Sequence, residues 1–382
     1  NLPLKLLWRN KLNIDSSYSM PTMQPVVHED RVVLFTGFPD AFLRCYAAED
    51  GRELWRWDEY LRHANPNDRM NQSFYQQYWL YDANGEMGMI DMRTGKTQWQ
   101  ISRISKFGES HIIDDYIYYG IKRNWGGDAQ VAGLRRTSVS QYQPEHIIDF
   151  RADTMDGKNH TVHPVNIWQA PWGDEIALFK LNGIDWRDLQ EFWHLYAYNL
   201  TADSIYYKKL NISTSVGGNR QYPVIDGNYA YLQTLRSLQC FDLVNRKQVW
   251  KHEFTGENSF FHFTFPNIIV DQSKVYILGD DGDLFAFDKV SGKQLWRLQD
   301  DPGGAIEDYM TLYKGVLYYT GEKGAIYGVR ASDGEVLLKM KSYNNEGYYN
   351  GGLNISEEHN QLYVSDGYDV MAFEIPEKWH YD

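Results

Sequence analysis

Short apolar runs separated by polar turns repeat along most of the chain, and residues 267–296 show the pattern most clearly. Two runs rich in β-branched and aromatic residues, 275–278 and 284–287, are joined by a stretch of Gly and Asp that is typical of a hairpin. The turn at 288–292 begins with an Asp that can accept backbone N–H bonds and ends with a Gly that permits positive φ. With the apolar run before them and the Trp296 segment after them, these runs predict a unit of four antiparallel strands.

The unit recurs along the chain. Asp91, Gly95 and Trp99 have the same spacing as Asp288, Gly292 and Trp296. Partial copies place Trp55, Tyr206, Trp250 and Leu338 at the Trp position, and the copy ending at Trp250 has Arg246 at the Gly position. Successive Trp positions are 42–46 residues apart, except for one interval of 107 residues. That interval predicts a degenerate extra unit, ending near residues 146–150.

The two ends of the chain supply one further unit. Residues 361–364 and 370–374 predict inner strands without a following Trp strand, whereas residues 4–9 predict a Trp strand with nothing before it. Pairing the two segments completes an eighth unit and closes a ring, which also removes exposed sheet edges. The sequence therefore predicts an all-β, eight-bladed β-propeller of four-stranded antiparallel blades, formed by residues 1–382 as a single domain.

The Asp-x-x-x-Gly-Lys-x-x-Trp unit resembles the tryptophan-docking repeat of PQQ-like propellers. That family includes eight-bladed quinoprotein alcohol dehydrogenases and non-catalytic BamB-type lipoproteins of the outer-membrane barrel-assembly machinery. The resemblance covers nearly the whole chain and is weakest between about residues 100 and 210. It implies a structural docking role for Trp8, Trp55, Trp99, Trp250 and Trp296.

Composition restricts the possible partners. The formal net charge of −13 disfavours binding to nucleic acid or to an anionic membrane surface. No apolar run is long enough to span a bilayer, so we expect no transmembrane segment. We expect a monomer outside the cytoplasm whose leader has been removed, and whether a lipid anchor precedes residue 1 stays open.

The two cysteines, Cys45 and Cys240, occupy equivalent positions in blades on opposite sides of the predicted ring. A disulfide tolerates only a few ångströms between its residues, so we expect two buried strand thiols. No histidine or cysteine spacing predicts a zinc site, and neither a phosphate-binding glycine loop nor a Gly-x-Ser-x-Gly elbow is present. Residues 280–283 lack the spacing of a calcium loop and are interpreted as a hairpin turn, so no metal site is predicted.

Residues that enter the innermost strands should ring one mouth of the central channel. This polar, aromatic and charged set either binds a small ligand or ion, or only holds water. Its candidates are Gln24, Gln72, His111, His163, Arg220, Gln221, Phe263, Glu307, Asp308, Tyr348 and Asn350.

Two longer loops carry exposed-type aromatic residues. Trp125 lies in the loop at 122–128, and Trp186 and Trp193 lie at 182–194, where helical spacing suggests a short helical turn. Loops inserted on a rigid scaffold commonly carry binding sites. These tryptophans are therefore candidates for partner contact, with packing as local plugs the equal alternative.

The resemblance leaves three functions open. The leading hypothesis is a non-catalytic scaffold of the cell envelope that binds other envelope proteins and holds no cofactor. The alternative is a quinone-dependent dehydrogenase with PQQ and calcium at the channel mouth, for which Arg220, Asp308, His163 and Asn350 are the first residues to test. The absence of adjacent cysteines lowers the weight of that alternative. The third is a surface protein that binds carbohydrate or peptide.

Overall fold

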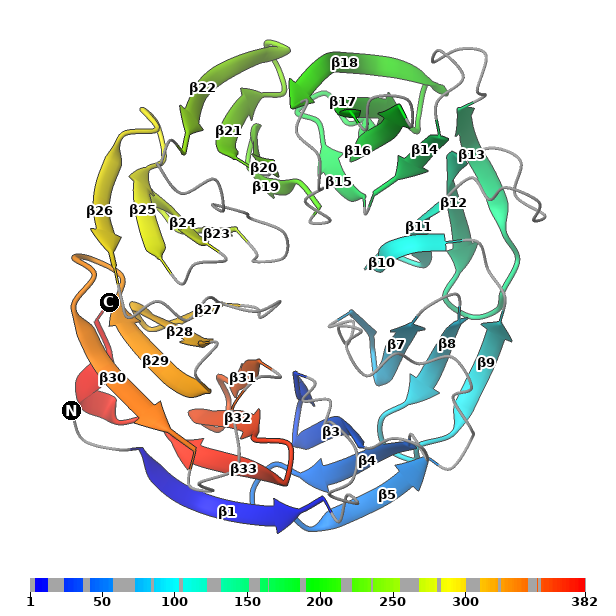
Figure 1. The fold of residues 1–382 in the computed structure, drawn as a ribbon. Helices are drawn as coiled ribbons and strands as arrows, with labels where there is room; N and C mark the ends of the chain where they lie inside the picture. Colours follow the sequence, from blue (N-terminus) through cyan, green and yellow to red (C-terminus); the bar gives the residue numbers. More distant parts are fainter. Residues whose placement is uncertain are drawn as a thin grey trace.

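In the computed structural model, eight antiparallel sheets form a closed ring (Figure 1). Seven sheets have four strands and one has five. The structure describes residues 4–12, 24–36, 42–57, 73–83, 86–102, 106–121, 132–150, 159–163, 165–185, 190–213, 222–234, 236–254, 268–279, 283–299, 310–321, 324–342, 349 and 352–381.

The strands follow the predicted order from the channel to the rim in each blade. Blade 1 contains β2 (Val26–His28), β3 (Arg31–Thr36), β4 (Phe42–Ala47) and β5 (Glu53–Trp57), and blade 2 contains β6 (Phe74–Tyr75), β7 (Tyr78–Ala83), β8 (Glu86–Asp91) and β9 (Thr97–Ser102). Blade 3 contains β10 (Lys106–Ile113), β11 (Tyr116–Ile121), β12 (Ala132–Ser138) and β13 (Glu145–Phe150). Blade 4 contains β14 (Asn159–Val162), β15 (Asn166–Gln169), β16 (Glu175–Asp185), β17 (Gln190–Asn199) and β18 (Ser204–Ser213). Blade 5 contains β19 (Val224–Asp226), β20 (Tyr229–Thr234), β21 (Ser237–Asp242) and β22 (Lys247–Glu253), and blade 6 contains β23 (Ile269–Val270), β24 (Lys274–Leu278), β25 (Leu284–Asp288) and β26 (Gln294–Leu298). Blade 7 contains β27 (Thr311–Tyr313), β28 (Val316–Thr320), β29 (Ala325–Arg330) and β30 (Val336–Lys341). Blade 8 contains β31 (Leu353–Ser356), β32 (Gln361–Ser365), β33 (Asp369–Glu374) and β1 (Lys5–Lys11).

Blade 8 is assembled from both ends of the chain. Strand β1 pairs antiparallel with β33, and Trp8 lies opposite Ala372 in the register. The Arg9 guanidinium also pairs with the Asp369 carboxylate, at 2.5 Å. The predicted closure of the ring by the N-terminal strand is therefore confirmed, as is the degenerate unit that ends in β13.

The predicted docking tryptophans join each blade to the next. The indole nitrogen of an outer-strand Trp donates a hydrogen bond to a backbone carbonyl in the last turn of the following blade. These bonds are Trp8 to Ala48 at 2.8 Å, Trp55 to Met92 at 2.7 Å, Trp99 to Val139 at 2.8 Å, Trp250 to Lys289 at 3.1 Å and Trp296 to Ala331 at 3.3 Å.

Where glycine occupies this turn under a docking tryptophan, two features favour it. Gly292 has φ +68°, a conformation that L side chains rarely adopt, and a Cβ added there would lie 2.5 Å from the Trp250 ring. Gly51, Gly95 and Gly334 also have positive φ, and a Cβ added to each would lie against the ring of Trp8, Trp55 and Trp296, respectively. The Asp-to-Gly-to-Trp spacing of the sequence therefore encodes contacts between blades as well as turns within them.

The apolar core is divided among the junctions between blades. In one buried cluster, Leu278 and Leu284 of blade 6 pack with Leu317 and Val329 of blade 7. Cys45 and Cys240 belong to two different clusters, and both are buried, free thiols as predicted. Within the described part of the chain, no helix has the length and apolar character needed to cross a membrane.

Blade 4 departs from the repeat. Its inner edge is split into β14 and β15, both of which pair with the eleven-residue strand β16. The suggested helical turn at 182–194 is wrong for the described residues, because β16 continues to Asp185 and β17 begins at Gln190. Trp193 lies within β17, and residues 186–189 are outside the described part.

Candidate functional site

The innermost strands surround the centre of the ring, as Figure 1 shows. Of the predicted channel-mouth residues, the structure describes Gln24, His111 and His163. The others lie outside the described residues: Gln72, Arg220, Gln221, Phe263, Glu307, Asp308, Tyr348 and Asn350.

Gln24 ties the last blade to the first. Its side chain is buried, and its amide nitrogen donates to the Leu353 carbonyl of blade 8 at 2.8 Å. Asn354 makes the reciprocal bond to the Pro25 carbonyl at 3.2 Å. The described contacts therefore place Gln24 in the wall of the ring, where it connects two inner strands.

His163 occupies the break between β14 and β15. Its backbone N–H donates to the Lys180 carbonyl at 2.9 Å, which keeps this part of the chain in register with β16. The imidazole is 1% exposed, and its centroid is 4.5 Å from that of Trp193. His163 thus faces the interior of blade 4.

Lys180 lies beside this pair and was missed in the sequence. Its ammonium nitrogen is 5.4 Å from the Trp193 ring centroid and 3.4 Å from the Gln233 carbonyl of blade 5. Complete burial lowers the pKa of Lys180 to about 7. The available signal was a single lysine within the otherwise apolar run of residues 176–181.

An aromatic contact passes across the inner side of blade 4. The His111 ring of blade 3 meets the Tyr222 ring before β19 edge-on, with a centroid distance of 4.3 Å and an interplanar angle of 75°. His111 therefore contacts blade 5 through Tyr222, whereas His163 and Lys180 pack beside Trp193 in blade 4.

The partner-loop candidates are placed differently from one another. Trp125 and Trp186 lie outside the described residues, whereas Trp193 is 3% exposed inside blade 4. An exposed tryptophan that the sequence analysis missed is Trp172, in the turn between β15 and β16, with 48% exposure. Its ring lies 5.4 Å from Trp168 and 5.7 Å from Tyr206.

Of the four residues named for the quinone alternative, the structure describes only His163. Among the described residues, no group of three or more His, Cys, Asp and Glu side chains could hold a metal ion. His163 and Lys180, which could otherwise contact a quinone, are enclosed between strands. We therefore derive no catalytic step from this region.

The family model for outer membrane protein assembly factor BamB matches residues 5–120 and 167–378. The chain belongs to the BamB family. The internal stretch that the model leaves unmatched, residues 121–166, contains β12 and β13 of blade 3 and β14 of blade 4. A search of curated proteins found no sequence match.

Solved structures with the same fold include a BamB protein, an alcohol dehydrogenase and Sqt1. BamB from Moraxella catarrhalis is 13% identical with a TM-score of 0.60, and the match covers 98% of this chain and 99% of that one. Quinohemoprotein alcohol dehydrogenase ADHIIG from Pseudomonas putida HK5 is 11% identical with a TM-score of 0.66, and the match covers 97% of this chain and 76% of that one. Sqt1 from Saccharomyces cerevisiae is 8% identical with a TM-score of 0.65, and the match covers 98% of this chain and 100% of that one. At these identities the similarity shows the fold alone.

Proposed function

We propose that this BamB-family chain is a non-catalytic scaffold of the cell envelope that acts outside the cytoplasm by binding other envelope proteins. The observation that carries the proposal is the match of the BamB model to most of the chain. The structural match to BamB from Moraxella catarrhalis also extends over 98% of this chain and 99% of that one.

The described surface suggests where a partner binds. We define the blade 4 edge as Trp172, Ile205, Lys208, Lys209 and Leu210, all of which are exposed. Outer strand β18 has ten residues, whereas the outer strands of the other blades have five to seven, and Figure 1 shows it on the rim of the ring. An extended partner segment could add to this strand by β-augmentation. The two lysines favour an acidic segment.

A site-specific crosslinking experiment tests this location. A photoreactive residue replaces Leu210 on β18 or, as a matched control, Leu295 on β26, which is similarly exposed on another outer strand. In the source cells, we expect envelope proteins to crosslink at position 210 and not at position 295. Equal crosslinking at both positions would reject the blade 4 edge, and no crosslink to an envelope protein would reject the scaffold function.

The second candidate is a PQQ-dependent dehydrogenase, favoured by the fold shared with quinohemoprotein alcohol dehydrogenase. A ligand present at about one hundred times its Kd adds about 2.7 kcal/mol to the free energy of unfolding. We expect PQQ with calcium to leave the melting temperature unchanged. A clear increase, accompanied by dye-linked alcohol oxidation, would replace the scaffold proposal with the enzymatic one.

A further inference from the structure

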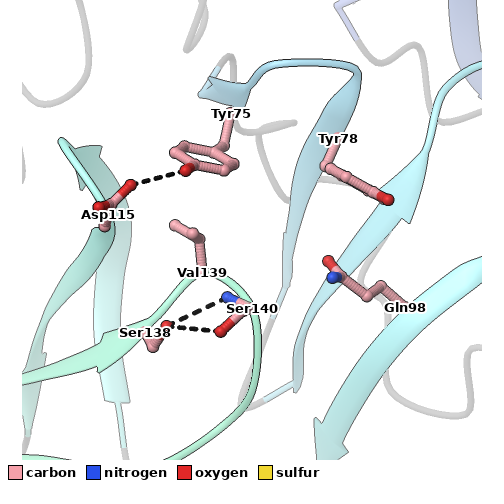
Figure 2. Close-up of a pocket in the computed structure, with 7 residues that line it drawn as sticks. All are labelled: Tyr75, Tyr78, Gln98, Asp115, Ser138, Val139 and Ser140. Atoms are coloured by element: carbon pink, nitrogen blue, oxygen red, sulfur yellow. Dashed lines mark hydrogen bonds between the residues drawn. The ribbon is translucent and has the colours of Figure 1, made fainter.

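An open pocket of about 260 Å³ lies between blades 2 and 3 (Figure 2). It is formed by the β6–β7 hairpin and the start of β9 on one side, and by the turns of blade 3 on the other. The lining residues are Tyr75, Tyr78, Gln98, Asp115, Ser138, Val139 and Ser140.

The lining of this pocket is acidic and aromatic. Asp115 supplies a carboxylate, and none of the seven lining residues is Lys or Arg. Tyr75 donates its hydroxyl hydrogen to Asp115 at 2.6 Å, and among the described residues no ion pair involves Asp115. A carboxylate next to aromatic rings provides a favourable environment for a cation.

The junction between blades 5 and 6 shows what occupies the equivalent space elsewhere in the ring. Val139 and Lys289 are equivalent because their carbonyls accept the docking bonds from Trp99 and Trp250. Their backbone N–H groups also make equivalent bonds, from Val139 to the Asp115 carbonyl at 3.0 Å and from Lys289 to the Ser273 carbonyl at 2.9 Å. The two junctions can therefore be compared residue by residue.

At the junction of blades 5 and 6, the chain's own ammonium group fills the space. Lys289 Nζ forms an ion pair with Asp226 and donates to the Asp271 carbonyl at 3.0 Å. Tyr75 is the counterpart of Asp226, because each residue belongs to the last pair of its hairpin, directly before a two-residue turn. Between blades 2 and 3, the short apolar side chain of Val139 replaces the lysine, and the carboxylate is supplied from the opposite blade by Asp115.

We propose that the pocket between blades 2 and 3 binds a primary ammonium group, which takes the place that Lys289 Nζ fills between blades 5 and 6. Asp115 is the counter-ion, and Tyr75 and Tyr78 supply aromatic surface. Gln98 and the Ser138 and Ser140 hydroxyls, which are hydrogen-bonded to each other, also line the pocket (Figure 2). The ammonium comes from a free alkylamine or from a lysine side chain of a partner protein. This site does not depend on the scaffold function proposed above.

Calorimetric titration of the full chain with n-butylamine and with blocked lysine, acetylated and amidated on its backbone, tests the proposal. Both should bind, and blocked Nε-acetyl-lysine, which lacks the charge, should not. Asp115→Asn should weaken binding at least about tenfold, because hydrogen bonds to charged groups are strong. Asp30→Asn is the matched control, because Asp30 occupies the same turn position in blade 1 and pairs with Arg31 instead.

A second variant tests the same site by filling it. Val139→Lys supplies an internal ammonium, so it should abolish amine binding and raise the melting temperature, and Asp115→Asn should remove that increase. Equal binding of n-butylamine by the parent protein and Asp115→Asn, or equal binding of charged and acetylated lysine, would overturn the proposal. A blocked Gly-Lys-Gly peptide that binds much more tightly than n-butylamine assigns the ammonium to a partner lysine, and equal affinities assign it to a free amine.

Discussion

The Arg246 guanidinium lies over the ring of Tyr206, with its central carbon 4.1 Å from the ring centroid. The two residues occupy the Gly and Trp positions of the docking unit at the junction of blades 4 and 5. Tyr206 still makes the docking bond, because its hydroxyl donates to the Leu243 carbonyl at 3.0 Å. Arg246 has φ +54°, so it keeps the backbone conformation that glycine has elsewhere. A cation–π pair thus replaces the Trp-on-Gly contact.

The first prediction concerns this pair. Arg246→Ala should lower the free energy of unfolding by about 0.5–1 kcal/mol, the range for an exposed cation–π contact. In a Tyr206→Leu background the same change should have almost no effect, because the ring is already gone. Urea unfolding measures both, with Arg236→Ala as the control for loss of an exposed arginine in blade 5. Equal losses in the two backgrounds would show that Arg246 acts independently of Tyr206.

The second prediction separates the two roles of the docking glycine. Gly292→Ala combines strain at φ +68° with a Cβ 2.5 Å from Trp250. Gly227→Ala has a similar strain, at φ +56°, but its Cβ meets nothing within 4 Å. We expect Gly227→Ala to cost about 1–2 kcal/mol and Gly292→Ala about 1–3 kcal/mol more, measured by urea unfolding. Equal costs would mean that the tryptophan contact does not require glycine.

Most of the ring was predictable from sequence because its junctions use a fixed set of residues at fixed spacing. Asp288, Gly292 and Trp296 identified the unit, and Trp8 identified the closing strand. Tyr206 was recognised as a substitute for Trp. Its partner Arg246 could not be interpreted in advance, because the contact joins two blades and only the assembled ring brings them together.

Blade 4 was predicted less well for a physical reason. Trp186, Leu189 and Trp193 have helical spacing, but β16 and β17 extend into this region as paired strands, with Asn182 opposite Trp193. Strand pairing across the blade therefore outweighed a local pattern. The position of Lys180 beside His163 and Trp193 also depends on this pairing, so the sequence alone did not reveal it.

The third prediction concerns the junction of blades 7 and 8, where Leu338 stands at the Trp position. The last strand of blade 8 comes from the N-terminus, so the chain after β33 is free to cross to blade 7, and Tyr381 N–H donates to the Lys314 carbonyl at 2.9 Å. Trp379, in the short 3₁₀ helix η2 (Glu377–Trp379), is 6% exposed and belongs to the same buried cluster as Leu338. The C-terminal segment therefore adds Trp379 to the apolar cluster at this junction, where Leu338 stands in place of a docking Trp.

Trp379→Ala should consequently lower the free energy of unfolding by about 3–5 kcal/mol, the usual cost of removing a buried tryptophan. Lys378→Ala, at the exposed neighbouring position, should change it by less than about 0.5 kcal/mol. Thermal and urea unfolding of both variants measure the difference. If the two variants had a similar free energy of unfolding, the C-terminal segment would not stabilise the junction.

The fourth prediction is a pH dependence caused by Lys180. Its pKa is about 7 in the folded chain, because burial disfavours the charged form, and about 10.4 in the unfolded chain. Below the folded pKa both states are protonated, and the cost of the buried charge is constant. Between the two values the unfolded state binds more protons, so stability increases with pH by up to about 1.4 kcal/mol per unit.

Lys180→Met should remove this increase, because methionine fills a similar volume without a titratable group. The measurement is the difference in free energy of unfolding between Lys180→Met and the parent protein, from about pH 6 to about pH 10, so that other titrating groups cancel. The advantage of methionine should be largest near pH 6 and shrink as the pH rises. Lys208→Met, at an exposed position on β18, should show no such trend. A difference for Lys180→Met that is independent of pH would mean that Lys180 keeps an ordinary pKa, and that water or a negative group reaches its ammonium inside the blade.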